Sequence, residues 1–195
     1  MDYTTLIIVI LAGILGYLIW DTYFATEVEY VTSRVDNQEY LVRSLPDKQQ
    51  AADLIANIRI RLEKMVKHLE VTYPNDPRTK MLLDNFRPDK ISEGSENSKY
   101  TSYSVNKGEK LVLCLRSKDE KKQLVDLNTM MFVSLHELSH MGTKSVGHTK
   151  EFWDNFRWIL KESIKINIYK YQDFNSKPEG YCGIQITDNP LNKGD

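Results

Sequence analysis

The stretch from residue 136 to residue 148 reads His-Glu-Leu-Ser-His-Met-Gly-Thr-Lys-Ser-Val-Gly-His and holds three of the four histidines of the chain. On a helix, His136 and His140 are about one turn apart, so both imidazoles project from one face and can bind the same metal ion. His148 follows a short loop and can supply a third ligand. The pattern is typical of a zinc site.

The number of ligands predicts what such a zinc would do. Three protein ligands leave the fourth position of a tetrahedral zinc open, as a hydrolytic site requires, whereas a structural zinc has four. Glu137 would act as general base towards the zinc-activated water. Tyr100, Tyr103 and Tyr181 are candidate donors to the oxyanion that the sequence does not distinguish, and each is equally compatible with a place in the core.

The spacing after the second histidine excludes one zinc-enzyme pattern and leaves another open. A metzincin would need glycine at 143 and histidine at 146, but the chain has Thr143 and Val146. A gluzincin would use a glutamate on the following helix, where Glu162 stands. We prefer His148, because Thr149 can cap a helix whose apolar stripe would hold this ligand against the core. Glu162 is then expected on the helix surface.

The order His136-Glu-Leu-Ser-His140, then Gly147-His148-Thr-Lys-Glu-Phe152-Trp153, resembles the pattern of the WLM and SprT-like group of minimal zinc peptidases. The resemblance implies a minimal zincin fold, zinc on the three histidines, Glu137 as the catalytic base and a protein or peptide substrate. The part from about residue 45 to residue 186 also resembles predicted metallopeptidases encoded by large DNA viruses. The stretches that carry this second likeness are Leu-Pro-Asp-Lys-Gln-Gln-Ala-Ala at 45–52, Asn-Ser-Lys-Tyr-Thr-Ser-Tyr-Ser-Val-Asn-Lys-Gly at 97–108 and Tyr-Cys-Gly-Ile at 181–184.

The N-terminal stretch is the second distinctive feature. Residues 3–20 carry no charge, and as a helix they would span about 27 Å, close to the thickness of a bilayer's hydrocarbon core. The stretch lacks the basic start and the cleavage site of a secretory signal. We therefore expect residues 1–25 to be a single-pass transmembrane anchor in the lipid bilayer, in a host or virion membrane if the protein is viral. Arg34 and Arg43 follow the span, which favours a cytosolic catalytic domain.

Composition limits the partners. The chain has 26 basic and 27 acidic side chains, no basic tail and no aromatic-basic stripe, so we expect no nucleic-acid partner. Cys114 and Cys182 are expected to be buried free thiols, with pairing left open for an oxidising compartment. His68 is expected at the surface of a helix. The sequence does not indicate an oligomeric state.

The remaining chain predicts an α+β fold, a minimal zincin-like metallopeptidase domain with a small, mostly antiparallel sheet, preceded by the N-terminal transmembrane helix. We expect a stalk or hairpin over residues 26–45 and the metallopeptidase domain over residues 46–195. The elements expected in that domain are a long helix opened by Pro46, a short helix from Pro77, a loop over 87–99, a hairpin of 100–105 and 110–116, the active helix from 127 to 141 with Asn128 or Thr129 as its cap, a helix over 149–168 and a last strand near 181–187 that returns to the sheet.

Two other functions stay open at this point. The chain could be a structural or assembly membrane protein, possible for a viral component, that retains a zincin fold without catalysis. Glu137 argues against this alternative, because a purely structural zinc site has no use for a base beside the metal. A zinc hydrolase acting on another bond is also compatible, since the motif describes the activation of water and not the bond that is attacked.

Overall fold

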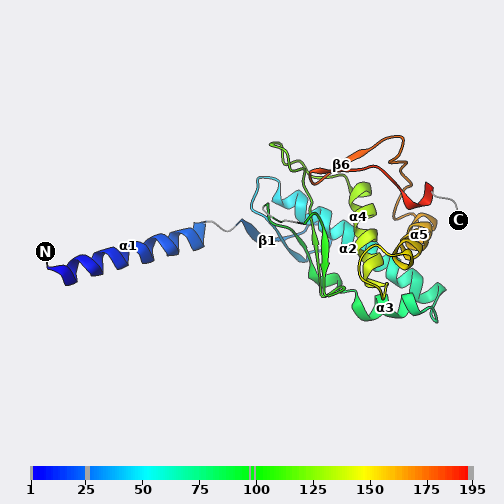
Figure 1. Ribbon diagram of the computed structural model, residues 1–195, viewed down its shortest axis with the longest axis horizontal. Coiled ribbons are helices and arrows are strands. Elements are labelled where there is room, and N and C mark those ends of the chain that lie inside the picture. Colours follow the sequence, from blue (N-terminus) through cyan, green and yellow to red (C-terminus); the bar gives the residue numbers. More distant parts are fainter. Residues whose placement is uncertain (1, 25–26, 97, 99, 193–195) are drawn as a thin grey trace.

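The N-terminal helix stands apart from the rest of the chain (Figure 1). The computed structural model describes residues 2–24, 27–96, 98 and 100–192, with only the backbone described for residues 20–24. Helix α1 (Tyr3–Phe24) projects from one end of the molecule, and the remaining elements pack together beyond it. Residues 1, 25 and 26 of the expected anchor and stalk, and residues 193–195 of the expected domain, lie outside the described residues.

The predicted transmembrane anchor is wrong. A membrane-spanning helix needs about 20 predominantly apolar residues. Among the described residues, no helix combines the length and the apolar character that a crossing requires. The expected single-pass membrane localisation depended on this helix, so it is corrected with it.

A β-hairpin leads into the packed part of the chain. Strands β1 (Val28–Thr32) and β2 (Glu39–Arg43) pair antiparallel. Tyr40 and Val42 on β2 are buried in the core, and both strands contact the long helix that follows. The hairpin is therefore attached to the core by apolar contacts.

Helix α2 (Lys48–Thr72) runs through the centre of the core. Its apolar residues recur at spacings of three and four, as in an amphipathic helix that faces a core. Helix α3 (Pro77–Asn85) follows, with the Asp76 carboxylate accepting the N–H of Arg78 as its cap. Both helices confirm the sequence prediction. The stripe of α2 is fully buried along its length at Ala51, Ile55, Ile58, Leu62, Met65 and Leu69.

A three-stranded sheet lies in front of α2, in the order β3-β5-β4. Strand β5 (Lys110–Leu113) is parallel to β3 (Ile91–Glu93) and antiparallel to β4 (Tyr103–Val105), so the predicted hairpin is confirmed with shorter strands. Strand β3 follows the short helix η1 (Pro88–Lys90) and lies where a loop was predicted. All three residues of β3 are buried. Glu93 accepts hydrogen bonds from Arg43 and Arg116, whereas the Ser92 hydroxyl has no hydrogen-bond partner among the described residues.

Helix α4 (Leu127–Met141) packs against both α2 and α5 (Lys150–Lys165). The Asp126 carboxylate caps α4 by accepting the backbone N–H groups of residues 128 and 129, so the predicted caps at these two positions are wrong. Thr149 caps α5 as predicted, accepting the N–H of Phe152.

The C-terminal part forms a separate small hairpin. Strands β6 (Glu179–Tyr181) and β7 (Ile184–Ile186) pair with each other, and the short helix η2 (Pro190–Asn192) follows them. The predicted return of a last strand to the central sheet is therefore wrong. A disulfide between Cys114 and Cys182 joins this hairpin to the end of β5, which corrects the expectation of free thiols.

Candidate metal centre

Three histidines from α4 and the loop after it converge on one point. The Nε2 atoms of His136 and His140 are 3.3 Å apart, and the Nε2 atom of His148 is 3.0 Å from that of His136. The ligand atoms of all three lie within 4.8 Å of one another. Two nitrogens bound to one tetrahedral zinc at about 2.0–2.1 Å would be about 3.4 Å apart, so this arrangement fits a single metal ion.

The surroundings keep two of these imidazoles neutral, which is the form that binds metals. Burial lowers the pKa of His136 to about 3, and the neighbouring His140 and His148 act in the same direction. Burial also lowers the pKa of His140 to about 4, with contributions from His148 and the Lys107 ammonium. Protons therefore do not compete for these two nitrogens at neutral pH.

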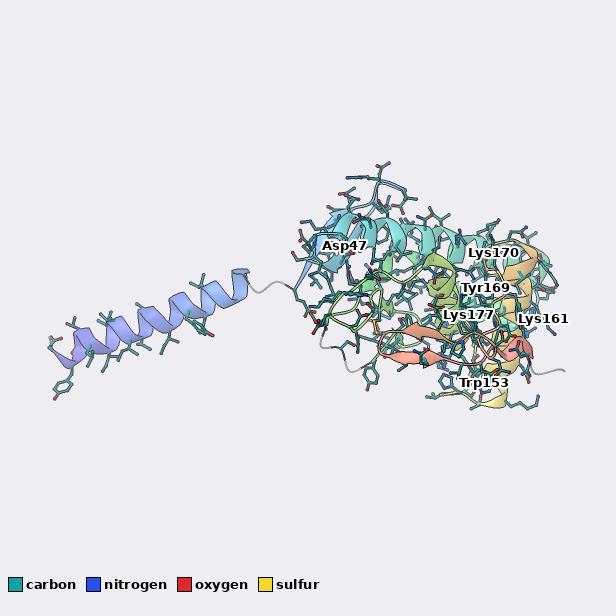
Figure 2. All side chains as sticks on the ribbon, turned by 90° about the horizontal axis from the view of Figure 1, so that it is seen from above. Asp47, Trp153, Lys161, Tyr169, Lys170 and Lys177 are labelled. Carbon is teal, nitrogen blue, oxygen red and sulfur yellow. A yellow bond between two sulfur atoms is a disulfide. The ribbon has the colours of Figure 1, made fainter. Side chains whose placement is uncertain are left out.

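Aromatic rings of α5 form the wall behind the histidines. The Phe152 ring is stacked on His140, with centroids 4.2 Å apart, and lies 4.7 Å from the His148 ring. Trp153 lies 5.6 Å from His148 and sits at the edge of the domain, far from Asp47 at the start of α2 (Figure 2). The predicted apolar stripe of α5 thus contacts the loop histidine directly.

Glu137 points from α4 towards strand β4. Its side chain is 7% exposed, and burial raises the pKa of its carboxyl group to about 7, against the opposing effect of a hydrogen bond from the backbone N–H of Ser104. A carboxyl group with a pKa near neutrality can both accept and release a proton under physiological conditions.

Strand β4 borders a groove of about 510 Å³ that contains this centre. Because β4 is the outer strand in the order β3-β5-β4, its second edge is not paired with β5. The groove is lined by the three histidines, Glu137, residues 101–104, Asn106, Lys107 and residues 145–147. The three histidines and the outer edge of β4, whose Ser104 N–H is bonded to Glu137, therefore meet in one groove.

The alternative third ligand lies elsewhere. The carboxylate of Glu162 accepts hydrogen bonds from His68 Nε2 at 2.8 Å and from the Tyr73 hydroxyl at 2.9 Å. Glu162 is only 2% exposed, so the expectation of a surface carboxylate is wrong, and His68 is half-buried as its partner. The two residues are far apart in the sequence, and no local pattern indicates their pairing.

Two groove residues escaped the sequence analysis. Ser102 accepts the N–H of Cys114 and shares a hydrogen bond of 2.5 Å with the Tyr181 hydroxyl, which is how this tyrosine reaches the groove wall. Lys107 contacts the loop that carries His148. Both lie in the stretch 97–108 that carries the likeness to viral proteins, but that likeness gave neither residue a role. Of the other candidate tyrosines, Tyr103 lines the groove.

In this α+β fold, a His-Glu-x-x-His helix lies beside a small β-sheet, and a third histidine follows in the next loop. These features define the class of zincin-like domains. The chain belongs to the WLM domain family, whose model matches residues 37–193. Among solved structures, Wss1 from Saccharomyces cerevisiae superposes with a TM-score of 0.51 at 22% identity, covering 65% of this chain and 86% of the Wss1 chain. A Wss1 mutant gives the same TM-score at 21% identity. At this identity the likeness concerns the fold.

Viral proteins are similar to this chain over most of its length. The uncharacterized protein R325 of Acanthamoeba polyphaga mimivirus is 36% identical over 170 residues, which cover 85% of this chain and 86% of that protein. The uncharacterized protein 136R of Invertebrate iridescent virus 6 is 25% identical over 160 residues, covering 76% and 84% of the two chains. The match to the family model confirms the resemblance to the WLM group, and the viral matches confirm the resemblance to proteins of large DNA viruses.

Proposed function

We propose that this protein is a zinc-dependent metallopeptidase, with His136, His140 and His148 as zinc ligands and Glu137 as general base. The observation that carries the proposal is the convergence of three histidine nitrogens and a buried carboxyl group on one groove. Membership of the WLM domain family, a zinc metallopeptidase-like family, supports it.

The chemistry of the proposed reaction divides between the metal and Glu137. When bound, zinc polarises the substrate carbonyl and lowers the pKa of a water molecule towards about 7. Glu137 takes the proton from the attacking water and then delivers it to the leaving amine. Its burial raises the pKa of the carboxyl group, which favours uptake of a proton from the water.

The substrate in this proposal is a protein or peptide in extended conformation. An extended chain can add to the free edge of a strand through main-chain hydrogen bonds. Strand β4 offers its outer edge along the groove, beside the three histidines, and a bound chain would meet Glu137 at the N–H of Ser104. A peptide bound there would pass the centre with its carbonyl groups close to the metal ligands.

Zinc analysis combined with a cleavage assay tests the proposal. We expect about one zinc per chain and cleavage of a peptide library by the wild-type protein. Glu137→Gln should keep the zinc and lose at least about 100-fold in turnover, because the shape is retained and only the proton acceptor is removed. Absence of zinc after reloading, or equal cleavage by the variant, would contradict the proposal. Bound zinc without any turnover would favour the structural alternative.

A further inference from the structure

The third histidine lies on a loop with little packing of its own. Between α4 and α5, residue 144 and residues 146–149 are exposed, and Val146 is 85% exposed. Gly147 adopts a positive φ of 81° with open space around it. An exposed loop samples many conformations unless other contacts restrict it, and a metal ligand needs a fixed direction. Contacts from outside the loop must therefore hold His148 in place.

Lys107 provides such a contact from the turn after β4. Its ammonium group donates to the backbone carbonyl of Thr143 at 2.9 Å and to that of Lys144, and lies 3.5 Å from the carbonyl of Ser145. An ammonium group has three N–H donors, so one lysine can serve three carbonyls. These carbonyls directly follow the C-terminus of α4, where positive charge is favourable. In Figure 1 the green β4–β5 hairpin and the yellow loop meet at the same end of the domain.

The turn that carries Lys107 is itself firmly placed. Asn106 and Lys107 both have positive φ, at 45° and 58°. Gly108, at φ 130°, packs so closely on α3 that a Cβ there would collide with the carbonyl oxygen of Asn85. The Asn85 side chain in turn donates to the carbonyl of Met141 at the end of α4. The turn is thus fixed between α3 and the end of the helix that carries the first two histidines.

Glu151 holds the same loop from the other side. Its carboxylate, in the first turn of α5, accepts the backbone N–H groups of Lys144 at 3.2 Å and Ser145 at 3.1 Å. In this loop, the Lys107 ammonium group therefore binds backbone carbonyls, and the Glu151 carboxylate binds backbone N–H groups. The Glu151 contacts are local in sequence, whereas Lys107 connects the loop to the wall of the groove formed by β4.

We propose that Lys107 is a positioning residue that holds residues 142–149, and with them His148, against the turn after β4. The inference rests on the proposed function, because it assigns Lys107 a part in placing the third ligand of that site. Lys107 also connects the strand edge on which a peptide would lie with the loop on the opposite side of the groove. Loss of the ammonium group would loosen the loop, which Glu151 would then hold from one side only, and weaken metal binding.

Two measurements on Lys107→Met and Lys107→Arg test the inference. Methionine keeps the apolar stem without the donors, whereas arginine keeps donors and charge. In the metal-free protein, exchange of the hydrogen-bonded amides of residues 142–145 should be at least about 10-fold faster in Lys107→Met, with exchange in α2 unchanged. Zinc affinity, measured by competition with a chelating dye, should fall by about 10- to 100-fold, the usual effect of losing a group that orients a ligand. Lys107→Arg should lie closer to wild type in both measurements.

Lys110→Met, which replaces a lysine of the same hairpin, is the matched control and should behave as wild type. Unchanged exchange in the loop of Lys107→Met would overturn the inference, and so would equally faster exchange in α2, because that would indicate general destabilisation. If the wild-type protein bound no zinc, the proposed function would fail, and the exchange measurement would still decide whether Lys107 holds the loop.

Discussion

At the scale of single residues, His148 and Glu162 were the two competing candidates for the third ligand. In the folded chain the Nε2 atom of His148 is 3.0 Å from that of His136. The carboxylate of Glu162 is instead occupied by His68 and Tyr73. Position therefore favours His148 as the third ligand in the proposed site, since both side chains could chemically bind zinc.

His148→Ala should therefore weaken zinc binding by more than about 100-fold, because losing a ligand should cost more than losing a group that orients one. Glu162→Gln should leave the zinc affinity within about 2-fold of wild type, since the Glu162 carboxylate is bound by His68 and Tyr73 and is not grouped with the three histidines. Dissociation constants from chelator competition at neutral pH provide the comparison. Similar affinities for His148→Ala and wild type would show that the loop histidine is not a ligand.

At the scale of elements, Glu162 joins α5 to α2 through a buried carboxylate. Burial acts to raise the pKa of this group, but hydrogen bonds from His68, Lys165 and Tyr73 outweigh it and hold the pKa below its ordinary value of 4.5. A carboxyl group whose pKa is lower in the folded than in the unfolded chain stabilises the fold above the ordinary pKa. That stabilisation is lost as the pH falls through the lowered value.

We expect Glu162→Gln to lower the free energy of unfolding at neutral pH by about 1–3 kcal/mol, because a charged acceptor of buried hydrogen bonds is lost. The difference from wild type should shrink as the pH falls below about 4.5, where the wild-type carboxyl group also becomes neutral. Urea unfolding of the metal-free proteins between about pH 7 and about pH 3 measures both effects. A difference that stayed constant with pH would refute the assigned role of the charge.

At the scale of the whole molecule, the disulfide between Cys114 and Cys182 connects residues 68 positions apart and ties the β6–β7 hairpin to the central sheet. A cross-link over a loop of this length restricts the unfolded chain and stabilises the folded one by about 4 kcal/mol in the chain-entropy description. It also fixes Tyr181, whose hydroxyl bonds Ser102 in the groove wall.

Reduction of the wild-type protein should therefore lower its free energy of unfolding by about 2–5 kcal/mol. Urea unfolding with and without a phosphine reductant measures this change. The double variant Cys114→Ala with Cys182→Ala should match the reduced protein and should not respond to the reductant. Equal stability of the oxidised and reduced wild type would contradict a stabilising disulfide.

Local patterns in the sequence predicted the elements that depend on nearest neighbours along the chain. The stripe of α2, the start of α3 at Pro77 and the Thr149 cap of α5 all follow from helix periodicity or capping chemistry. Strand β3 was missed because it has a single apolar residue, Ile91, and is buried through hydrogen bonds from distant arginines. No local pattern carries that information.

By itself, the sequence determined that His136 and His140 share one face of a helix beside Glu137, because a spacing of four residues is set by helix geometry alone. Only the tertiary structure decided that His148 joins them, that Glu162 is held by His68, and that Lys107 reaches the loop carbonyls. These contacts join residues that are separated by a loop or lie on different elements. The distances between such residues depend on how the helices and strands pack together. That packing is set by one hydrophobic core to which residues from several elements contribute.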